Sequence, residues 1–148
     1  MSIDTGTIDG ATHTRLERVY FEHTDFSGVV YHARYLDFLE HARSDYVRML
    51  DVHHAELSAG AYGESLAFAV RAMAIEYLGA ARIDDVLRVE TDRGRLEGAR
   101  LVFDQRIFRD GALILRATVT VVMVNAAGRP RRFPPFLLDR LGVARRAT

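Results

Sequence analysis

An aspartate and a histidine stand seven residues apart in a segment whose residue types suit hydrolytic chemistry. Asp25 lies in a predicted loop over residues 22–30, and His32 stands close to the start of a predicted helix. A carboxylate there can attack a carbonyl carbon or act as the base for a water molecule. The first backbone N–H groups of a helix lack internal partners and favour negative charge, so they form a natural oxyanion site. Taken alone, however, Asp25 is more simply an Asx-turn residue, and His32 a surface or core histidine.

The composition excludes several other kinds of chemistry. The chain has no Cys, which rules out a cysteine nucleophile, a thiolate metal site and a disulfide, and it has no Lys for a Schiff base. Its 20 basic and 20 acidic residues give a formal charge of zero, which argues against a nucleic-acid partner. His13, His53 and His54 have no acidic or histidine partner at metal-ligand spacing, so we interpret them as solvated side chains. We therefore expect no metal site.

The length and the apolar runs indicate one cytoplasmic domain. The chain has 148 residues, a usual size for a single domain. Residues 1–12 are polar and contain Gly, so we expect a flexible N-terminus followed by a single folded domain over 13–148. This start lacks the basic and apolar regions of a secretory signal, and no stretch approaches about 18 apolar residues. We therefore expect a cytoplasmic location and no membrane insertion.

One predicted helix and several predicted strands must position these side chains. The helix covers residues 31–50, where apolar side chains recur at spacings of three and four and form one stripe. The predicted strands cover residues 13–21, 66–78, 86–92, 100–108 and 113–123. Period-two alternation and the turn at Asp110-Gly111 indicate an antiparallel sheet with one buried face. The order predicts an α+β fold, although periodicity alone does not separate a hotdog, whose sheet wraps around one long central helix, from other one-helix sheets.

The segment YFEHTDFSGVVYHARY, residues 20–35, closely resembles the signature of the 4-hydroxybenzoyl-CoA thioesterase-like hotdog enzymes. It is most similar to the Tol-Pal-associated acyl-CoA thioesterases of the YbgC type. The mid-helix Glu40-x-Ala42-Arg43 and the stretch over residues 70–85 match further family segments, so the resemblance covers about residues 15–135. The sequence departs from the family pattern at four positions, which are His23, Phe26, His41 and Ala80. Phe26, beside the carboxylate, leaves the acyl preference open.

The resemblance implies hydrolysis of an acyl-CoA thioester to a carboxylic acid and free CoA. Asp25 would act as nucleophile or general base, two routes that the sequence does not separate. The thioester oxygen would meet the backbone N–H of His32, whose side chain would orient the substrate or transfer a proton. Gly28 would allow the backbone to approach the ligand closely. No cofactor is implied, because CoA is part of the substrate, although an acyl-carrier-protein thioester is also conceivable.

The resemblance also implies an assembly and further substrate contacts. Relatives form homodimers by joining sheets edge to edge, often paired into homotetramers, with the site between subunits. The predicted substrate-binding residues are Gly28, Val29, Tyr31, Tyr35, Glu40, Phe68, Val70 and Arg100. Packing is an equally good role for Tyr31 and Tyr35, and Glu40 with Arg43 also reads as an ordinary intrahelical pair. Arg129, Arg131 and Arg132 form a cluster that by default is a solvated face, with CoA phosphates as the alternative ligand.

Two other functional interpretations stand beside the enzyme. The first is a non-catalytic acyl-CoA-binding or scaffold protein that keeps the hotdog fold and is associated with the cell-envelope Tol-Pal system. The intact Asp25, Gly28 and His32 favour the enzyme, because a scaffold has no chemical need for a carboxylate at a helix start. The second is a hotdog dehydratase, which is weaker because the motif of those enzymes is not visible in this sequence.

Overall fold

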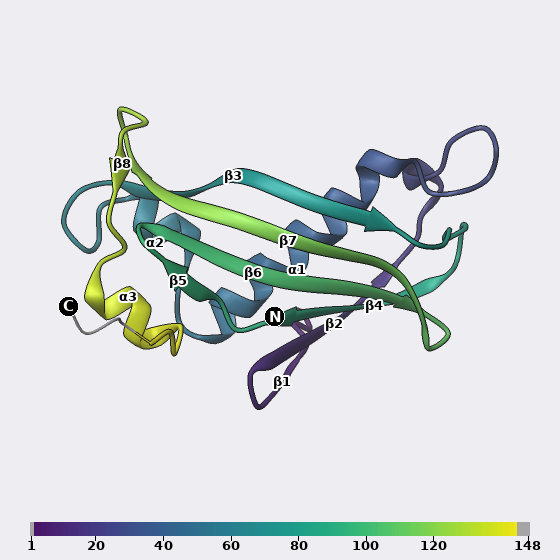
Figure 1. The fold of residues 1–148 in the computed structure, drawn as a ribbon, viewed down its shortest axis with the longest axis horizontal. Coiled ribbons are helices and arrows are strands. Elements are labelled where there is room, and N and C mark those ends of the chain that lie inside the picture. Colours follow the sequence, from purple (N-terminus) through teal and green to yellow (C-terminus); the bar gives the residue numbers. More distant parts are fainter. Residues whose placement is uncertain (1, 145–148) are drawn as a thin grey trace.

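The computed structural model describes residues 2–144 as one antiparallel sheet with one long helix (Figure 1). The strands are β1 (Thr7–Asp9), β2 (Thr12–Arg18), β3 (Leu66–Tyr77), β4 (Val86–Asp92), β5 (Arg95–Glu97), β6 (Arg100–Arg109), β7 (Ala112–Asn125) and β8 (Pro130–Arg131). The helices are α1 (Tyr35–Met49), α2 (His54–Ser58) and α3 (Pro135–Arg140), with 3₁₀ turns η1 (Phe21–His23) and η2 (His32–Arg34). The strand order is β1-β2-β4-β6-β7-β3, with β5 beside β6 and β8 beside β7.

Helix α1 lies across one face of the sheet and runs obliquely behind its strands in Figure 1. Its buried side chains are Tyr35, Phe38, Leu39, Ala42, Tyr46 and Val47. All of these except Tyr46 join a core with inward residues of β4, β6 and β7, among them Leu87, Ile107 and Val119. Burying the apolar stripe of the helix against the apolar face of the sheet removes both from water, which is the main stabilising term of such a fold. The predicted α+β hotdog class is confirmed.

The start of the chain departs from the expected flexible segment. Residues Thr7–Asp9 form β1, which pairs antiparallel with β2 from Thr12 onward. The side chain of His13 is fully buried, and its Nε2 lies 2.7 Å from the carbonyl oxygen of Thr5. This contact attaches the segment before β1 to the sheet, and β1 itself pairs with β2, unlike the flexible segment expected over residues 1–12. The interpretation of His13 as a solvated side chain is wrong, because its side chain is buried.

The elements around the predicted loop are shorter than expected. The first long strand ends at Arg18, and residues Phe21–His23 form the 3₁₀ turn η1. The backbone N–H of Tyr20 donates to Nδ1 of His23 at 2.9 Å, which turns the chain away from the sheet. The predicted helix over 31–50 begins with the 3₁₀ turn η2 and becomes α-helical at Tyr35. In the described part of the chain, no helix is long and apolar enough to span a membrane.

Candidate active site

Asp25 opens a tight turn, here called the Asp25 turn, that comprises residues 24–30. The backbone N–H of Asp25 donates to the carbonyl oxygen of Val29 at 2.9 Å, and the N–H of Gly28 donates to the carbonyl of Asp25 at 3.0 Å. Gly28 has φ +87°, a left-handed conformation that favours glycine. Two backbone hydrogen bonds and this glycine therefore fix the backbone of the turn that carries the Asp25 side chain.

The Asp25 carboxylate is held in its ionised form by donors from its own turn. Its Oδ1 accepts the hydroxyl of Ser27 and, at 2.9 Å, the backbone N–H of Ser27. The Ser27 hydroxyl is the largest cause that lowers the pKa of Asp25 below its usual value, and backbone N–H groups of the turn add to it. Asp25 is consequently a carboxylate at neutral pH, ready to act as nucleophile or base.

His32 stands at the first position of η2, where the chain enters the helix. Within residues 2–144 its backbone N–H donates no hydrogen bond, and its side chain is exposed. Its carbonyl oxygen accepts the hydroxyl of Tyr77 at 2.9 Å, and its ring lies against Tyr31, with centroids 4.5 Å apart. The turn therefore presents an unused backbone donor close to the Asp25 turn in the chain, as an oxyanion site requires.

Tyr77 is a neighbour of the site that the sequence prediction did not include. It is the last residue of β3, and its hydroxyl reaches the first residue of η2 across 45 positions of sequence. In the sequence, the one indication of a role for Tyr77 at the site is its position in the stretch over residues 70–85 that resembles the family. It ties the end of β3 to the helix start that carries His32.

Tyr35 is buried and positions the loop on which the Asp25 turn rests. Its hydroxyl accepts the backbone N–H of Ala81 at 3.0 Å, and burial raises the pKa of Tyr35 above its usual value. The carbonyl of Ala81 in turn accepts the N–H of Val30 at 2.8 Å, and Val29 forms an isolated bridge with Arg82. These contacts favour packing, the alternative role of Tyr35, over direct substrate contact.

Three of the predicted substrate-binding residues meet in a separate cavity, here called the helix pocket. Its volume is about 110 Å³, and its lining is Glu40, Arg43, Ser44, Val47, His54, Phe68, Val70, Phe103 and Val121. The hydroxyl of Ser44 donates to Glu40 Oε1 at 2.7 Å, and His54 Nε2 lies 3.1 Å from the same hydroxyl. Ser44 and His54 were absent from the predicted site. Ser44 lies one helical turn after Glu40, a spacing that could have indicated the contact.

The predicted site residues thus fall into two groups within one chain. Gly28 and Val29 form backbone hydrogen bonds with Asp25, and Tyr31 and His32 follow the turn in sequence. Glu40, Phe68 and Val70 line the helix pocket. Within residues 2–144, no hydrogen bond or ion pair joins the Asp25 side chain to the pocket. Arg100, the exposed first residue of β6, is not in the pocket lining.

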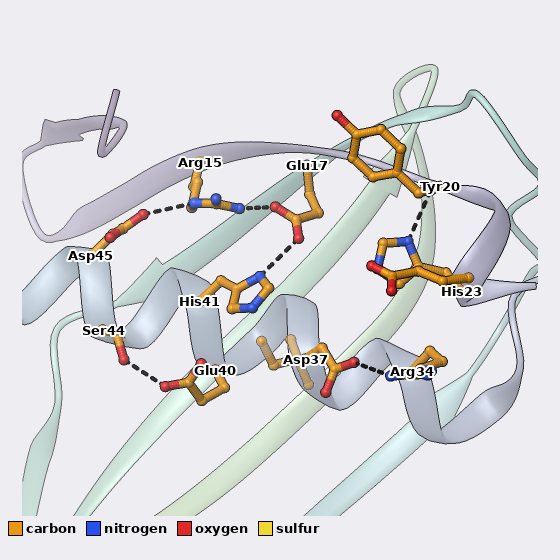
Figure 2. A network of polar contacts seen from close by, with 12 residues as sticks. Arg15, Glu17, Tyr20, His23, Arg34, Asp37, Glu40, His41, Ser44 and Asp45 are labelled. Atoms are coloured by element: carbon orange, nitrogen blue, oxygen red, sulfur yellow. Dashed lines mark hydrogen bonds and ion pairs between the residues drawn. The ribbon is translucent and has the colours of Figure 1, made fainter. Parts of the chain in front are cut away.

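A chain of charged contacts fixes α1 against β2 (Figure 2). Arg15 of β2 donates to Asp45 Oδ2 at 2.7 Å and to Glu17, whose Oε1 lies 2.8 Å from His41 Nδ1. Glu17 is buried, and its two partners satisfy a charge that would be costly alone. His41 occupies a position where the family pattern has Arg, and it keeps a polar link between helix and strand. This series of polar contacts holds α1, the helix that carries both Tyr35 and Glu40, against β2.

Comparisons with known proteins support the family and the fold. Residues 19–141 match the model of the thioesterase-like superfamily. The chain is 44% identical over 118 residues to "Acyl-CoA thioesterase YbgC" of Haemophilus influenzae, which covers 79% of this chain and 85% of that protein. It is 42% identical over 119 residues to "Acyl-CoA thioester hydrolase YbgC" of Escherichia coli, covering 79% and 86% of the two chains.

Solved structures of thioesterases have a similar fold. A probable thioesterase from Bartonella henselae has a TM-score of 0.81 and 43% identity, covering 84% of this chain and all of that one. A 4-hydroxybenzoyl-CoA thioesterase bound to its substrate has a TM-score of 0.80 over 89% of this chain and 99% of that one. Its identity is 19%, so that likeness concerns the fold alone.

Proposed function

The chain belongs to the thioesterase-like superfamily, and we propose that it hydrolyses acyl-CoA thioesters with Asp25 as its catalytic carboxylate. Membership of this family and relatives of 42% and 44% identity make it a thioester hydrolase. The observation that carries the residue assignment is the Asp25 carboxylate, held ionised by Ser27 in a rigid turn that leads into the helix start. A carboxylate and an oxyanion donor are the two groups that thioester hydrolysis needs.

The proposed reaction begins with the thioester oxygen at the free backbone N–H of His32. Asp25 then either attacks the carbonyl carbon, giving an anhydride that water hydrolyses, or removes a proton from a water molecule that attacks. In both routes the carbon–sulfur bond breaks, CoA leaves as a thiolate that takes up a proton, and the acyl group ends as a carboxylate. The exposed His32 imidazole is placed to orient the substrate or to supply that proton.

We further propose that the complete site forms between two copies of the chain. Strand β3 is the last strand of the sheet order, and among the described residues its outer edge has no partner strand. Such an edge is a ready surface for pairing with a second chain. Phe68 and Val70 lie on β3, so a dimer joined there would bring the helix pocket of one copy towards the Asp25 turn of the other. A homotetramer, an acyl-carrier-protein partner and a cytoplasmic location stay predictions.

Asp25 Oδ1 accepts the backbone N–H of Ser27, which is the hydrogen bond of an Asx turn, so this contact fits the alternative scaffold function as well. A scaffold associated with the Tol-Pal system would need the hotdog surface, but it would not need an ionised carboxylate oriented by two donors from Ser27. The similarity to relatives of 44% and 42% identity that are named as acyl-CoA thioester hydrolases favours catalysis.

A thiol-release assay on the purified protein tests the proposed function. The substrates would be acyl-CoA esters of increasing chain length together with benzoyl-type esters, and the matched oxygen esters would serve as controls. We expect release of CoA from at least one class, with the rate profile reporting the size of the acyl site. Absence of thiol release across the panel would contradict the proposal and favour the scaffold.

A further inference from the structure

Arg43 places a cationic group in the wall of the helix pocket without a carboxylate partner. Its Nη1 donates to Gln105 Oε1 at 3.0 Å, and within residues 2–144 no ion pair to Arg43 is formed. Burial lowers the pKa of Arg43, and the negative charge of Glu40 opposes this shift. The guanidinium nevertheless stays protonated, as guanidinium groups do in proteins. Partly buried charges are normally paired. The unused donors of Arg43 therefore suit an anion inside the pocket.

The other polar groups of the pocket are already engaged. The Ser44 hydroxyl donates to Glu40, so His54 Nε2–H donates to Ser44. Burial lowers the pKa of His54, which keeps this ring neutral near neutral pH. Glu40 adds a competing negative charge, but its side chain is turned to Ser44 and does not form an ion pair with Arg43. Arg43 is thus the group of the pocket with free hydrogen-bond donors and a positive charge.

The remaining walls are apolar and the space is small. Val47, Phe68, Val70, Phe103 and Val121 line the rest of the helix pocket. Its volume of about 110 Å³ is below the roughly 300 Å³ at which pockets for drug-sized ligands begin, so a short acyl group suits it. A few methylenes followed by one carboxylate would fill this space, with the methylenes against the apolar walls.

We propose that Arg43 is a specificity-determining residue that binds a carboxylate at the far end of the acyl group. The preferred substrates would then be short dicarboxylic acids carried as half thioesters of CoA, because a guanidinium binds a carboxylate through two parallel hydrogen bonds. This inference rests on the proposed function, since it assigns the helix pocket to the acyl group.

Binding of non-hydrolysable thioether analogues tests the inference independently of turnover. S-(4-carboxybutyl)-CoA and S-pentyl-CoA have chains of similar length and differ in the terminal carboxylate. We expect the wild type to bind the carboxylate analogue more tightly, and Arg43→Gln to reduce this preference by about 10- to 100-fold, as for a lost charged hydrogen bond. Arg43→Lys should keep part of the preference. Arg48→Gln removes the same charge from the exposed face of α1 and should leave it unchanged.

Glu40→Gln provides a second test if Arg43→Gln fails to fold, which circular dichroism would reveal. Removing the competing charge should increase the preference for the carboxylate analogue. Equal binding of the two analogues by the wild type, or a preference that none of the Arg43 and Glu40 variants alters, would overturn the inference.

Three further outcomes separate failure of the inference from failure of the proposed function. If Arg43 instead binds the carboxylate product, Arg43→Gln would weaken inhibition by free pentanoate and leave the analogue preference intact, which also overturns the inference. If pentanoyl-CoA is hydrolysed while the preference is absent, the proposed function stands and the inference alone fails. If no thioester is hydrolysed but the preference is present, the proposed function alone fails.

Discussion

At the scale of single residues, the proposed chemistry depends on the hydrogen bonds that Ser27 donates to the Asp25 carboxylate. Ser27 gives Asp25 both a hydroxyl and a backbone N–H, and both contacts stabilise the ionised form. Phe26 stands between the two residues in sequence but is fully exposed, so it takes no part in this stabilisation. Its position beside the carboxylate leaves it free to contact an acyl group or a second chain.

Replacing Ser27 with Ala should shift the acid limb of the pH profile. The lost hydroxyl raises the pKa of Asp25, and because the ionised carboxylate is the active form, kcat/KM should begin to fall at a higher pH than in the wild type. Thr24→Val is the control, since the Thr24 hydroxyl donates to the carbonyl of Phe21 and not to Asp25. Measured pH–rate profiles that coincide for wild type and Ser27→Ala would contradict this role.

At the scale of elements, the site is held where three segments meet. The start of α1 supplies Tyr35, the end of β3 supplies Tyr77, and the segment before β4 supplies Ala81 and Arg82. Each contact joins residues far apart in the sequence. The Asp25 turn therefore depends on packing of these segments as much as on its own hydrogen bonds.

Tyr35→Phe tests this support. The substitution keeps the ring but leaves the buried N–H of Ala81 without an acceptor, so the free energy of unfolding should fall by about 1–3 kcal/mol. Tyr31→Phe, which removes a hydroxyl from a side chain that is 48% exposed, should change stability by less than about 0.5 kcal/mol. Urea unfolding at a common pH measures both values. Equal free energies of unfolding for the two variants would contradict the role of the Tyr35 hydroxyl in supporting this loop.

The elements that could be predicted are those with a local periodicity of apolar residues in the sequence. The stripe on residues 35–50 identified α1, because its side chains recur with the helical period. The 3₁₀ form of His32–Arg34 was not predictable, because the Tyr77 hydroxyl that binds its first carbonyl lies on a distant strand. The three residues of β1 are too few to show alternation, and the buried His13 holds this region through a contact that no spacing reveals.

The candidate site was predictable to a similar extent. The motif around Asp25 and His32 identified the turn and the helix start, while Ser44 and His54 were missed because side-chain contacts inside a pocket leave little trace in a single sequence. Tyr35 was named for substrate contact or packing, and only the hydrogen bond from Ala81 favours packing.

At the scale of the whole molecule, the chain carries the Asp25 turn and the helix pocket on different parts of the fold. The Asp25 turn lies before α1, and the helix pocket lies between α1, α2 and the sheet strands β3, β6 and β7. A symmetric dimer joined at β3 would use each of them twice, because every contact in a twofold assembly is repeated. In the proposed dimer, each active site would take its carboxylate from one copy and its helix pocket from the other.

Mixing two inactive variants tests the shared site. Asp25→Asn removes the carboxylate, and Val70→Arg fills the helix pocket; each homodimer should be inactive. Co-expression should restore about a quarter of wild-type activity, because half of the dimers are mixed and each mixed dimer has one intact site. Activity that is absent from the mixture, with mixed dimers demonstrated by mass spectrometry, would place the complete site within one chain.

The most direct test of the central claim compares Asp25→Asn with Asp110→Asn in thiol release. Asp110 lies in the exposed β6–β7 turn with φ +49°, a conformation that Asn accepts, so this control makes the same chemical change away from the site. We predict that Asp25→Asn lowers kcat by about 100-fold or more while its circular dichroism and oligomeric state match the wild type, and that Asp110→Asn keeps full activity. Turnover of Asp25→Asn close to that of the wild type would contradict the assignment of Asp25 as the catalytic carboxylate.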